Sequence, residues 1–185
     1  MESSSSQAYT LSRPVFFIGF MGAGKTTITR RLARSLGLVS VDVDHFIERE
    51  QGASIKQLFH ERGQEQFRQL EAAALESFLV GEPKLISCGG GIVCGKASCA
   101  IIRERGLSIY LYVSPDESAE RISNHDTRPF FETMDSVREV NAERVPVYED
   151  LADRTVDTTG RHPGDVAREV KEILVEEGVL CLSQK

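Results

Sequence analysis

The chain has 185 residues, a length typical of one domain, and 41% of them are hydrophobic. Its 22 Lys and Arg face 28 Asp and Glu, a formal net charge of −6, which argues against DNA or RNA as the main partner because phosphate backbones select basic surfaces. The four cysteines form no CxxC pair, so we expect free thiols rather than disulfides or a zinc site.

Targeting signals are also missing from the sequence. No segment reaches the roughly 20 apolar residues that a membrane-spanning helix needs. The N-terminus is polar and rich in serine, and it lacks the basic stretch followed by an apolar stretch that marks a signal peptide. We therefore expect a cytoplasmic protein without a membrane partner. Its expected organisation is a disordered tail over residues 1–13, a single domain over 14–177 and a C-terminal tail over 178–185.

The first half of the chain alternates predicted strands and helices. The apolar run Val15–Ile18 predicts a strand buried on both faces. A helix over 26–36 follows, with an apolar residue at every fourth position and a glycine directly after its end. Three more elements come next: a strand at 38–41, a helix at 44–50 and the longest helix at 63–80.

The second half continues the alternation, and strands that alternate with helices imply a parallel sheet covered on both faces. Residues 123–133 are polar and lack a regular period, which predicts a mobile loop. The other elements, in chain order, are a strand at 84–87, helical sequence up to 105, a strand at 107–113, a helix from Pro115, a helix at 134–148, a strand at 154–157 and a helix from Pro163.

The clearest motif runs from Gly19 to Thr26 and matches GxxxxGK[ST] at every fixed position, between a predicted strand and a predicted helix. Glycines such as Gly22 and Gly24 let backbone N–H groups turn inward as an anion nest, and the helix points its positive end at the phosphates. Lys25 is then expected to reach the β- and γ-phosphates, and the Thr26 hydroxyl to bind Mg²⁺. The alternative is a glycine-rich turn with an exposed lysine.

Two carboxylates, Asp42 and Asp44, stand at the end of the second predicted strand. Alternation along a strand would place both on one face, and the carboxyl ends of parallel strands open into the crevice where such sheets bind ligands. One is suited to organise Mg²⁺ through water, and the other to accept hydrogen bonds from substrate hydroxyls or to take a proton. Alternatively, Asp44 only caps the helix that follows.

Several arginines and a glycine run are candidates for the acceptor side. Arg68 and Glu71 on the longest predicted helix form either a surface ion pair or a guanidinium held in place to grip a carboxylate. Gly89–Gly91 follow a strand directly, and they either admit a ligand to the backbone or form a flexible turn. Arg128 and Arg144, brought near the same phosphate site as Arg68, would complete an anion-binding site.

Together these features resemble the shikimate kinase family, over roughly residues 15–175. The resemblance implies a P-loop, nucleoside-monophosphate-kinase-like α/β fold, with a five-stranded parallel sheet flanked by helices and a mobile lid at about 123–133. It also suggests a monomer. The sequence elements that carry it are, in order, the phosphate loop from Gly19, Asp42-Val43-Asp44, Phe67-Arg68 with Glu71, Gly89-Gly90-Gly91, Arg128-Pro129, Arg144-Val145-Pro146-Val147-Tyr148, and Val156-Asp157-Thr158 followed by Arg161 and Pro163.

The resemblance implies an ATP-dependent kinase that uses Mg²⁺ and transfers the γ-phosphoryl group to the 3-hydroxyl of shikimate, in chorismate and aromatic amino-acid biosynthesis. The implied catalytic residues are Lys25, the candidate base Asp44 and the lid residue Arg128. The implied ATP-binding residues are Gly22, Ala23, Gly24, Lys25, Thr26, Thr27, Arg121, Arg128 and the adenine-contacting Arg161. Thr26 and Asp42 match the metal site, and the shikimate side comprises Asp44, Arg68, Gly89, Gly90, Gly91 and Arg144.

Two other interpretations share the phosphate loop. A gluconate kinase would have the loop and the lid, but it is not expected to combine the aspartate pair with Arg68, the glycine run and Arg144. A non-catalytic nucleotide-binding relative would usually have lost Lys25, Asp44 or the lid arginine, and this sequence keeps all three.

Overall fold

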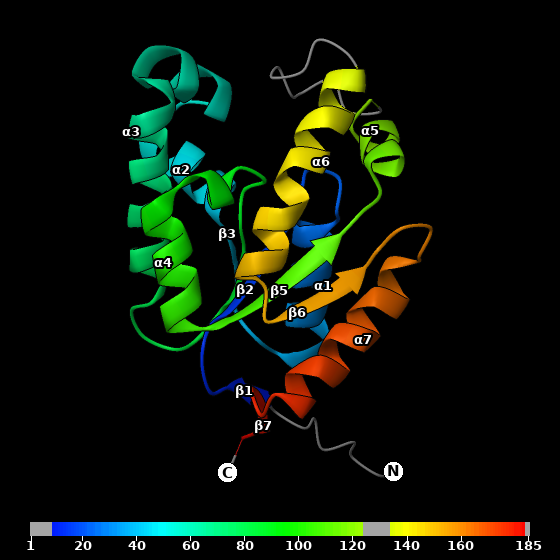
Figure 1. Ribbon diagram of the computed structural model, residues 1–185. Coiled ribbons are helices and arrows are strands. Elements are labelled where there is room, and N and C mark those ends of the chain that lie inside the picture. Colours follow the sequence, from blue (N-terminus) through cyan, green and yellow to red (C-terminus); the bar gives the residue numbers. More distant parts are fainter. Residues whose placement is uncertain (1–8, 124–133, 184–185) are drawn as a thin grey trace.

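The computed structural model describes residues 9–123 and 134–183 (Figure 1). Arg128 and the predicted lid, apart from Ser123 at the end of a helix, lie outside these residues. The strands are β1 (Tyr9–Leu11), β2 (Val15–Ile18), β3 (Ser40–Asp42), β4 (Leu85–Ser87), β5 (Leu107–Tyr112), β6 (Arg154–Asp157) and β7 (Leu180–Leu182). The helices are α1 (Lys25–Leu36), α2 (Val43–Gln51), α3 (Ile55–Phe78), the short 3₁₀ turn η1 (Ile92–Cys94), α4 (Lys96–Arg105), α5 (Pro115–Ser123), α6 (Met134–Leu151) and α7 (Pro163–Glu176).

Five of the strands form one parallel sheet in the order β3-β4-β2-β5-β6, which confirms the predicted fold class. β2 is the central strand, and Phe16 in it pairs with Ile86 of β4 on one side and with Ser108 of β5 on the other. Each connection between consecutive strands of this sheet contains a helix. The carboxyl ends of all five strands therefore lie at one edge, where parallel sheets bind their ligands.

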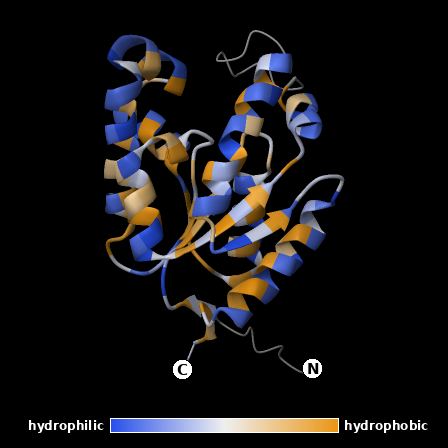
Figure 2. Ribbon diagram, viewed as in Figure 1, coloured by the Kyte–Doolittle hydropathy of each residue, from blue (hydrophilic) through white to orange (hydrophobic). Residues whose placement is uncertain are grey.

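Alternate side chains of β2 enter two different hydrophobic cores. Val15 and Phe17 pack into the core that α1 and α7 cover, and Phe16 and Ile18 pack into the core that α2, α3, α4 and α6 cover. All four are fully buried. Figure 2 shows hydrophobic residues gathered on the strands and hydrophilic ones on the outer faces of the helices. The strand that carries the phosphate loop is thus fixed from both sides.

The helix α3 is longer than the sequence predicts. A capping box at Ser54 and Gln57 starts it, with each residue's side chain bonded to the other's backbone N–H. Gly63, where the sequence analysis begins the helix, has φ 76° and ψ 171°, non-helical values that divide α3 into two helical pieces joined at a kink. The predicted start therefore matches the boundary at which the second piece begins, and the structure adds the piece before it.

The two chain ends also differ from the expectation of tails over 1–13 and 178–185. Tyr9–Leu11 and Leu180–Leu182 pair as the antiparallel strands β1 and β7, below the main sheet in Figure 1. Leu11 and Leu180 are buried against the core under α1 and α7, which stabilises the pair. Each strand has only three residues, too few for a periodic signal in the sequence.

All four cysteines are free, as predicted. Within 9–123 and 134–183, no helix has both the length and the apolar character needed to cross a membrane.

Candidate active site

The phosphate loop joins β2 to α1 at the carboxyl edge of the sheet. Gly19, Gly22 and Gly24 have φ values of 142°, 77° and 84°, a region in which an L side chain is strained. A Cβ at Gly19 would also overlap the backbone carbonyl of Leu111, and one at Gly22 would lie 3.2 Å from the carbonyl oxygen of Ser118. The shape of the loop therefore depends on glycine, and α1 begins directly after it with its N-terminus facing the loop.

A cavity of about 740 Å³ opens beside the loop, within the roughly 300–1,000 Å³ typical of small-molecule sites. The predicted ATP-binding residues 22–27, Arg121 and Arg161 all line it. So do Asp42, Asp44 and Gly90, which the sequence analysis assigns to the metal and the acceptor. One cavity thus joins the predicted nucleotide side to Asp44 and Gly90, whereas the other predicted acceptor residues, Arg68, Gly89, Gly91 and Arg144, are not among those that line it.

Lys25 is buried, and its ammonium group is held inside the loop. Nζ donates hydrogen bonds to the carbonyl oxygens of Gly19 (2.7 Å) and Phe20 (2.8 Å). The hydroxyl of Thr29 donates to the carbonyl oxygen of Lys25 over 2.6 Å, which anchors the first turn of α1. A buried cation needs such partners, and here they keep the charge beside the loop's N–H groups.

Three oxygen-bearing side chains meet next to Lys25. Thr26 Oγ1 donates to Asp42 Oδ2 over 2.7 Å and lies 3.2 Å from Ser87 Oγ. Asp42 Oδ1 accepts a hydrogen bond from the His45 N–H over 3.1 Å and so caps α2. The predicted strand alternation of Asp42 and Asp44 is therefore wrong. The strand ends at Asp42, Asp44 lies in the first turn of α2, and the capping residue is Asp42 rather than Asp44.

The glycine run makes room for close-packed side chains. A Cβ at Gly89 would overlap the Asp44 carboxylate and lie 3.2 Å from Glu71 Oε1. A Cβ at Gly91 would lie 2.5 Å from Arg68 Nη2. The three glycines therefore serve close approach to other residues and are more than a flexible turn.

Arg68 and Glu71 form a buried ion pair. Nη1 of Arg68 lies 2.5 Å from Oε2 of Glu71, and their side chains are 14% and 1% exposed. The guanidinium also lies over the rings of Phe59 and Phe67, 5.5 and 5.6 Å from their centroids. Burial raises the pKa of Glu71 to about 7, and the charge of Arg68 opposes this rise. The surface-pair interpretation is thus excluded, and the guanidinium is held in one place.

Arg144 reaches the same glycine run from α6. Its Nη1 donates to the carbonyl oxygen of Gly90 over 3.2 Å, and its guanidinium lies 5.7 Å from the ring centroid of Phe20. Tyr148, one turn later, donates its hydroxyl to the same carbonyl oxygen and stacks on Tyr110 with 5.0 Å between centroids. Asp44, Arg68 and Arg144 are therefore gathered around Gly89–Gly91 from three different helices.

The two arginines of the nucleotide side also contact backbone carbonyls. Arg121 donates through Nη1 to Gly22 over 2.7 Å and through Nη2 to Thr158 over 3.1 Å. Arg161 donates through Nη1 to the carbonyl oxygen of Asp157 over 2.9 Å and pairs with Glu169 at 2.7 Å.

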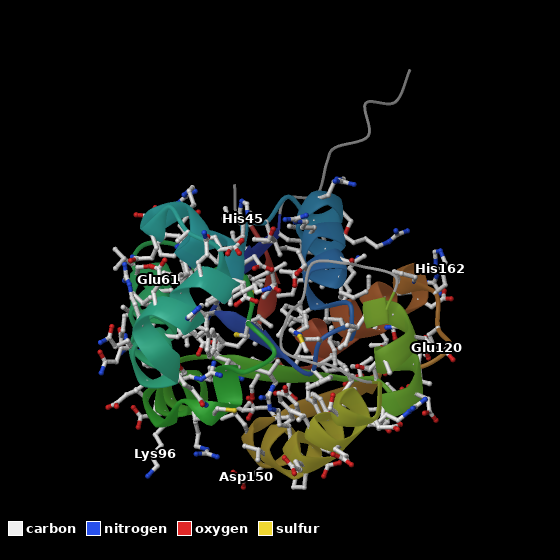
Figure 3. The ribbon with its side chains drawn as sticks, turned by 90° about the horizontal axis from the view of Figure 1, so that it is seen from above. His45, Glu61, Lys96, Glu120, Asp150 and His162 are labelled. Atoms are coloured by element: carbon white, nitrogen blue, oxygen red, sulfur yellow. The ribbon has the colours of Figure 1, made fainter. Side chains whose placement is uncertain are left out.

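Viewed from above, the part of α3 that carries Glu61 and the part of α5 that carries Glu120 lie on opposite sides of the molecule (Figure 3).

Three residues at the site were not singled out as site residues by the sequence analysis. Ser87 lies beside Thr26, Tyr148 bonds to the glycine run, and Glu117 bonds to Arg121. Two of them left a signal in the sequence: Ser87 ends a predicted strand just before the glycines, and Tyr148 ends the Arg144–Tyr148 motif that carries the family resemblance.

A model of the shikimate kinase family matches residues 21–175 of the sequence. The chain belongs to the shikimate kinase family. It is 38% identical over 162 residues to a shikimate kinase of Dehalococcoides mccartyi, covering 86% of this chain and 92% of that protein. A shikimate kinase of Bordetella pertussis is 39% identical over 164 residues, covering 87% and 76%. The predicted shikimate kinase activity, an ATP-dependent phosphorylation of a small molecule, is thus confirmed.

Solved structures agree with this family assignment. A shikimate kinase from Acinetobacter baumannii in complex with shikimate has a TM-score of 0.83 and 28% sequence identity, covering 89% of this chain and 94% of that one. A gluconokinase from Sinorhizobium meliloti has a TM-score of 0.58 at 15% identity and shares the fold alone. The comparisons thus favour the shikimate kinase interpretation over the gluconate kinase alternative.

Proposed function

We propose that this chain transfers the γ-phosphoryl group of ATP to the 3-hydroxyl of shikimate. A bond forms between that oxygen and the γ-phosphorus, the bond from the γ-phosphorus to the bridging oxygen breaks, and ADP leaves with the bridging oxygen. The observation that carries the proposal is the placement of two aspartates. Asp42 bonds to Thr26 of the phosphate loop, and Asp44, two residues later, lies against Gly89 on the acceptor side.

The nucleotide side supports binding of ATP in the cavity. The loop N–H groups and Lys25 are suited to the phosphates, and Arg161, which also lines the cavity, is suited to the adenine. Arg128 lies outside the described residues, and we propose for it a place in a lid that closes over the phosphates. Closure would exclude water, which would otherwise compete with the acceptor hydroxyl.

The residues beside the phosphate loop fit Mg²⁺. Thr26, Asp42 and Ser87 offer hydroxyl and carboxylate oxygens, the ligands that Mg²⁺ prefers. No group of three or more His, Cys, Asp and Glu able to hold a metal occurs among residues 9–123 and 134–183, which suits an ion that keeps water and phosphate ligands. We propose that Thr26 binds this ion directly and Asp42 through water. The bound ion would neutralise charge on the β- and γ-phosphates.

The acceptor side supports binding of a ring with a carboxylate and several hydroxyls, as shikimate has. Arg68 and Arg144 supply two guanidinium groups, and the buried Nε of Arg68 has no hydrogen-bond partner among the described residues. The solved relative from A. baumannii is in complex with shikimate. Asp44 is suited to bind the ring hydroxyls and to accept the proton of the attacking 3-hydroxyl. All of these residues come from one chain, so a monomer suffices for the reaction.

The test of the acceptor assignment compares Arg144→Ala with Arg62→Ala. Arg62 lies on α3, where it donates to Gln51 at an exposed position. Because a hydrogen bond between charged groups contributes roughly 1.5–3 kcal/mol, Arg144→Ala should raise KM for shikimate roughly ten- to a hundredfold. KM for ATP should stay within about twofold, and Arg62→Ala should resemble the wild type.

Arg68→Ala should behave like Arg144→Ala, although it also leaves Glu71 buried without its cation. Steady-state kinetics with each substrate varied in turn provides the measurement. Wild-type KM for shikimate in Arg144→Ala would refute the carboxylate assignment. A rise in KM for ATP of the same size would place Arg144 on the nucleotide side instead.

A further inference from the structure

The helix α5 connects two segments that both line the nucleotide cavity. Its Arg121 donates to the carbonyl oxygen of Gly22 in the phosphate loop (2.7 Å) and to that of Thr158, in the loop between β6 and α7 (3.1 Å). In Figure 3, α5 with Glu120 and the start of α7 with His162 lie on the same side of the molecule. One guanidinium thus links two segments that are 136 residues apart in sequence (158 − 22).

Glu117, one turn before Arg121, completes the link. Its Oε1 accepts a hydrogen bond from Arg121 Nη2, and its Oε2 accepts one from the N–H of Gly160 over 2.7 Å. The side chains of Arg121 and Glu117 are 31% and 24% exposed, so solvent only partly screens the pair. One carboxylate oxygen therefore holds the Arg121 guanidinium, and the other holds the loop that carries Gly160.

Parallel contacts are made by Ser118, which lies between Glu117 and Arg121, and by Ser114, directly before α5. The Ser118 hydroxyl donates to the carbonyl oxygen of Met21 over 2.9 Å, and the Ser114 N–H donates to Thr159 Oγ1 over 3.0 Å. These are further bonds to the same two segments. Both segments are thus attached to α5 at more than one point.

We propose that Glu117 and Arg121 act as a clamp that sets the spacing between the phosphate loop and residues 158–161, with Glu117 as a positioning residue for the nucleotide. The inference rests on the proposed binding of ATP in this cavity. Arg121 Nη1 and Nη2 already donate to protein acceptors, as expected of a side chain that holds the phosphate loop and residues 158–161 together. A nucleotide that spans both segments needs them at a fixed separation, whereas a free polyphosphate contacts the phosphate loop alone.

The clamp can be tested with two ligands that share a phosphate part. Isothermal titration calorimetry at constant Mg²⁺ would compare ADP with inorganic pyrophosphate, for the wild type, Glu117→Ala and Glu117→Gln. Glu172→Ala is the matched control, because Glu172 is an exposed acid on α7. Loss of two hydrogen bonds to a partly exposed carboxylate should weaken ADP binding roughly five- to tenfold in Glu117→Ala. Pyrophosphate binding should change less than about twofold.

Glu117→Gln keeps an acceptor oxygen for Gly160, so its loss of ADP affinity should be smaller than that of Glu117→Ala. KM for ATP should follow the ADP affinity, and KM for shikimate should not move. Equal losses for ADP and pyrophosphate would overturn the clamp, since they would place the effect at the phosphates alone. Unchanged ADP affinity in both Glu117 variants would also overturn it. Failure of the wild type to bind ADP would instead refute the proposed function. If Glu117→Ala does not fold, the ADP and pyrophosphate affinities of Glu117→Gln decide whether the clamp exists.

Discussion

Replacing Gly91 with alanine should displace the Arg68 guanidinium without straining the backbone. Gly91 has φ −99° and ψ 4°, values that alanine also adopts, so the substitution acts through the new methyl group. That Cβ would lie 2.5 Å from Nη2 and 2.8 Å from Nη1 of Arg68. Because non-bonded carbon and nitrogen atoms normally stay about 3.5 Å apart, the guanidinium must move by about 1 Å.

This displacement should be costly because Arg68 has little freedom to adjust. Glu71 holds one side of its guanidinium, and the rings of Phe59 and Phe67 lie against it. A misplacement of about 1 Å can reduce a rate by roughly a hundredfold. We therefore expect kcat/KM for shikimate to fall ten- to a hundredfold, which corresponds to roughly 1.4–2.7 kcal/mol of transition-state stabilisation. KM for ATP should stay within about twofold.

Steady-state kinetics with a coupled ADP-release assay provides the measurement, and Gly95→Ala is the matched control. A Cβ at Gly95, in the same segment, would lie 3.3 Å from Ser98 Oγ and 3.5 Å from Arg68 Cδ, contacts that small shifts relieve. Wild-type kcat/KM for shikimate in Gly91→Ala would refute the reasoning. An equal loss in Gly95→Ala would show that any added methyl group in this segment has the same effect.

Three further predictions follow from the same structure. Burial raises the pKa of Glu71 to about 7, so below that pH the carboxylate takes a proton and loses its charge interaction with Arg68. The pH profile of kcat/KM for shikimate should therefore fall on the order of tenfold per unit on the acid side of 7, and Glu71→Gln should lack this limb. Tyr148→Phe removes one of two hydrogen bonds to the Gly90 carbonyl, and kinetics should reveal a rise of roughly threefold in KM for shikimate at constant KM for ATP. Leu174→Ala, at a fully buried position on α7, should cost roughly 2–5 kcal/mol in urea unfolding; a cost below about 1 kcal/mol would contradict the packing described.

Features that depend on neighbouring residues could be predicted from the sequence. The phosphate loop is one, because its glycines, lysine and threonine lie within eight residues and sit between a strand and a helix. The strand β2 is another, since four consecutive apolar residues after a proline indicate a fully buried strand. The parallel sheet followed from the alternation of such strands with helices.

Features that depend on distant partners could not be predicted. The strands β1 and β7 are stable only because they pair with each other across 169 residues (180 − 11). The start of α2 at Val43 depends on the Asp42 carboxylate, which caps the helix and also bonds to Thr26. Such contacts leave no period in the sequence, which is why the alternation of the two aspartates was wrong.

The central claim, that the acceptor side of this cavity selects shikimate, is tested most directly by ADP release. The assay would supply Mg-ATP with shikimate, gluconate, quinate or no acceptor. We expect release that depends on shikimate and stays at the background level with the other acceptors, because Arg68 and Arg144 converge on the glycine run beside Asp44. Release driven by gluconate in place of shikimate would agree with a kinase activity but contradict the assigned acceptor site. No release with any acceptor would contradict the activity itself.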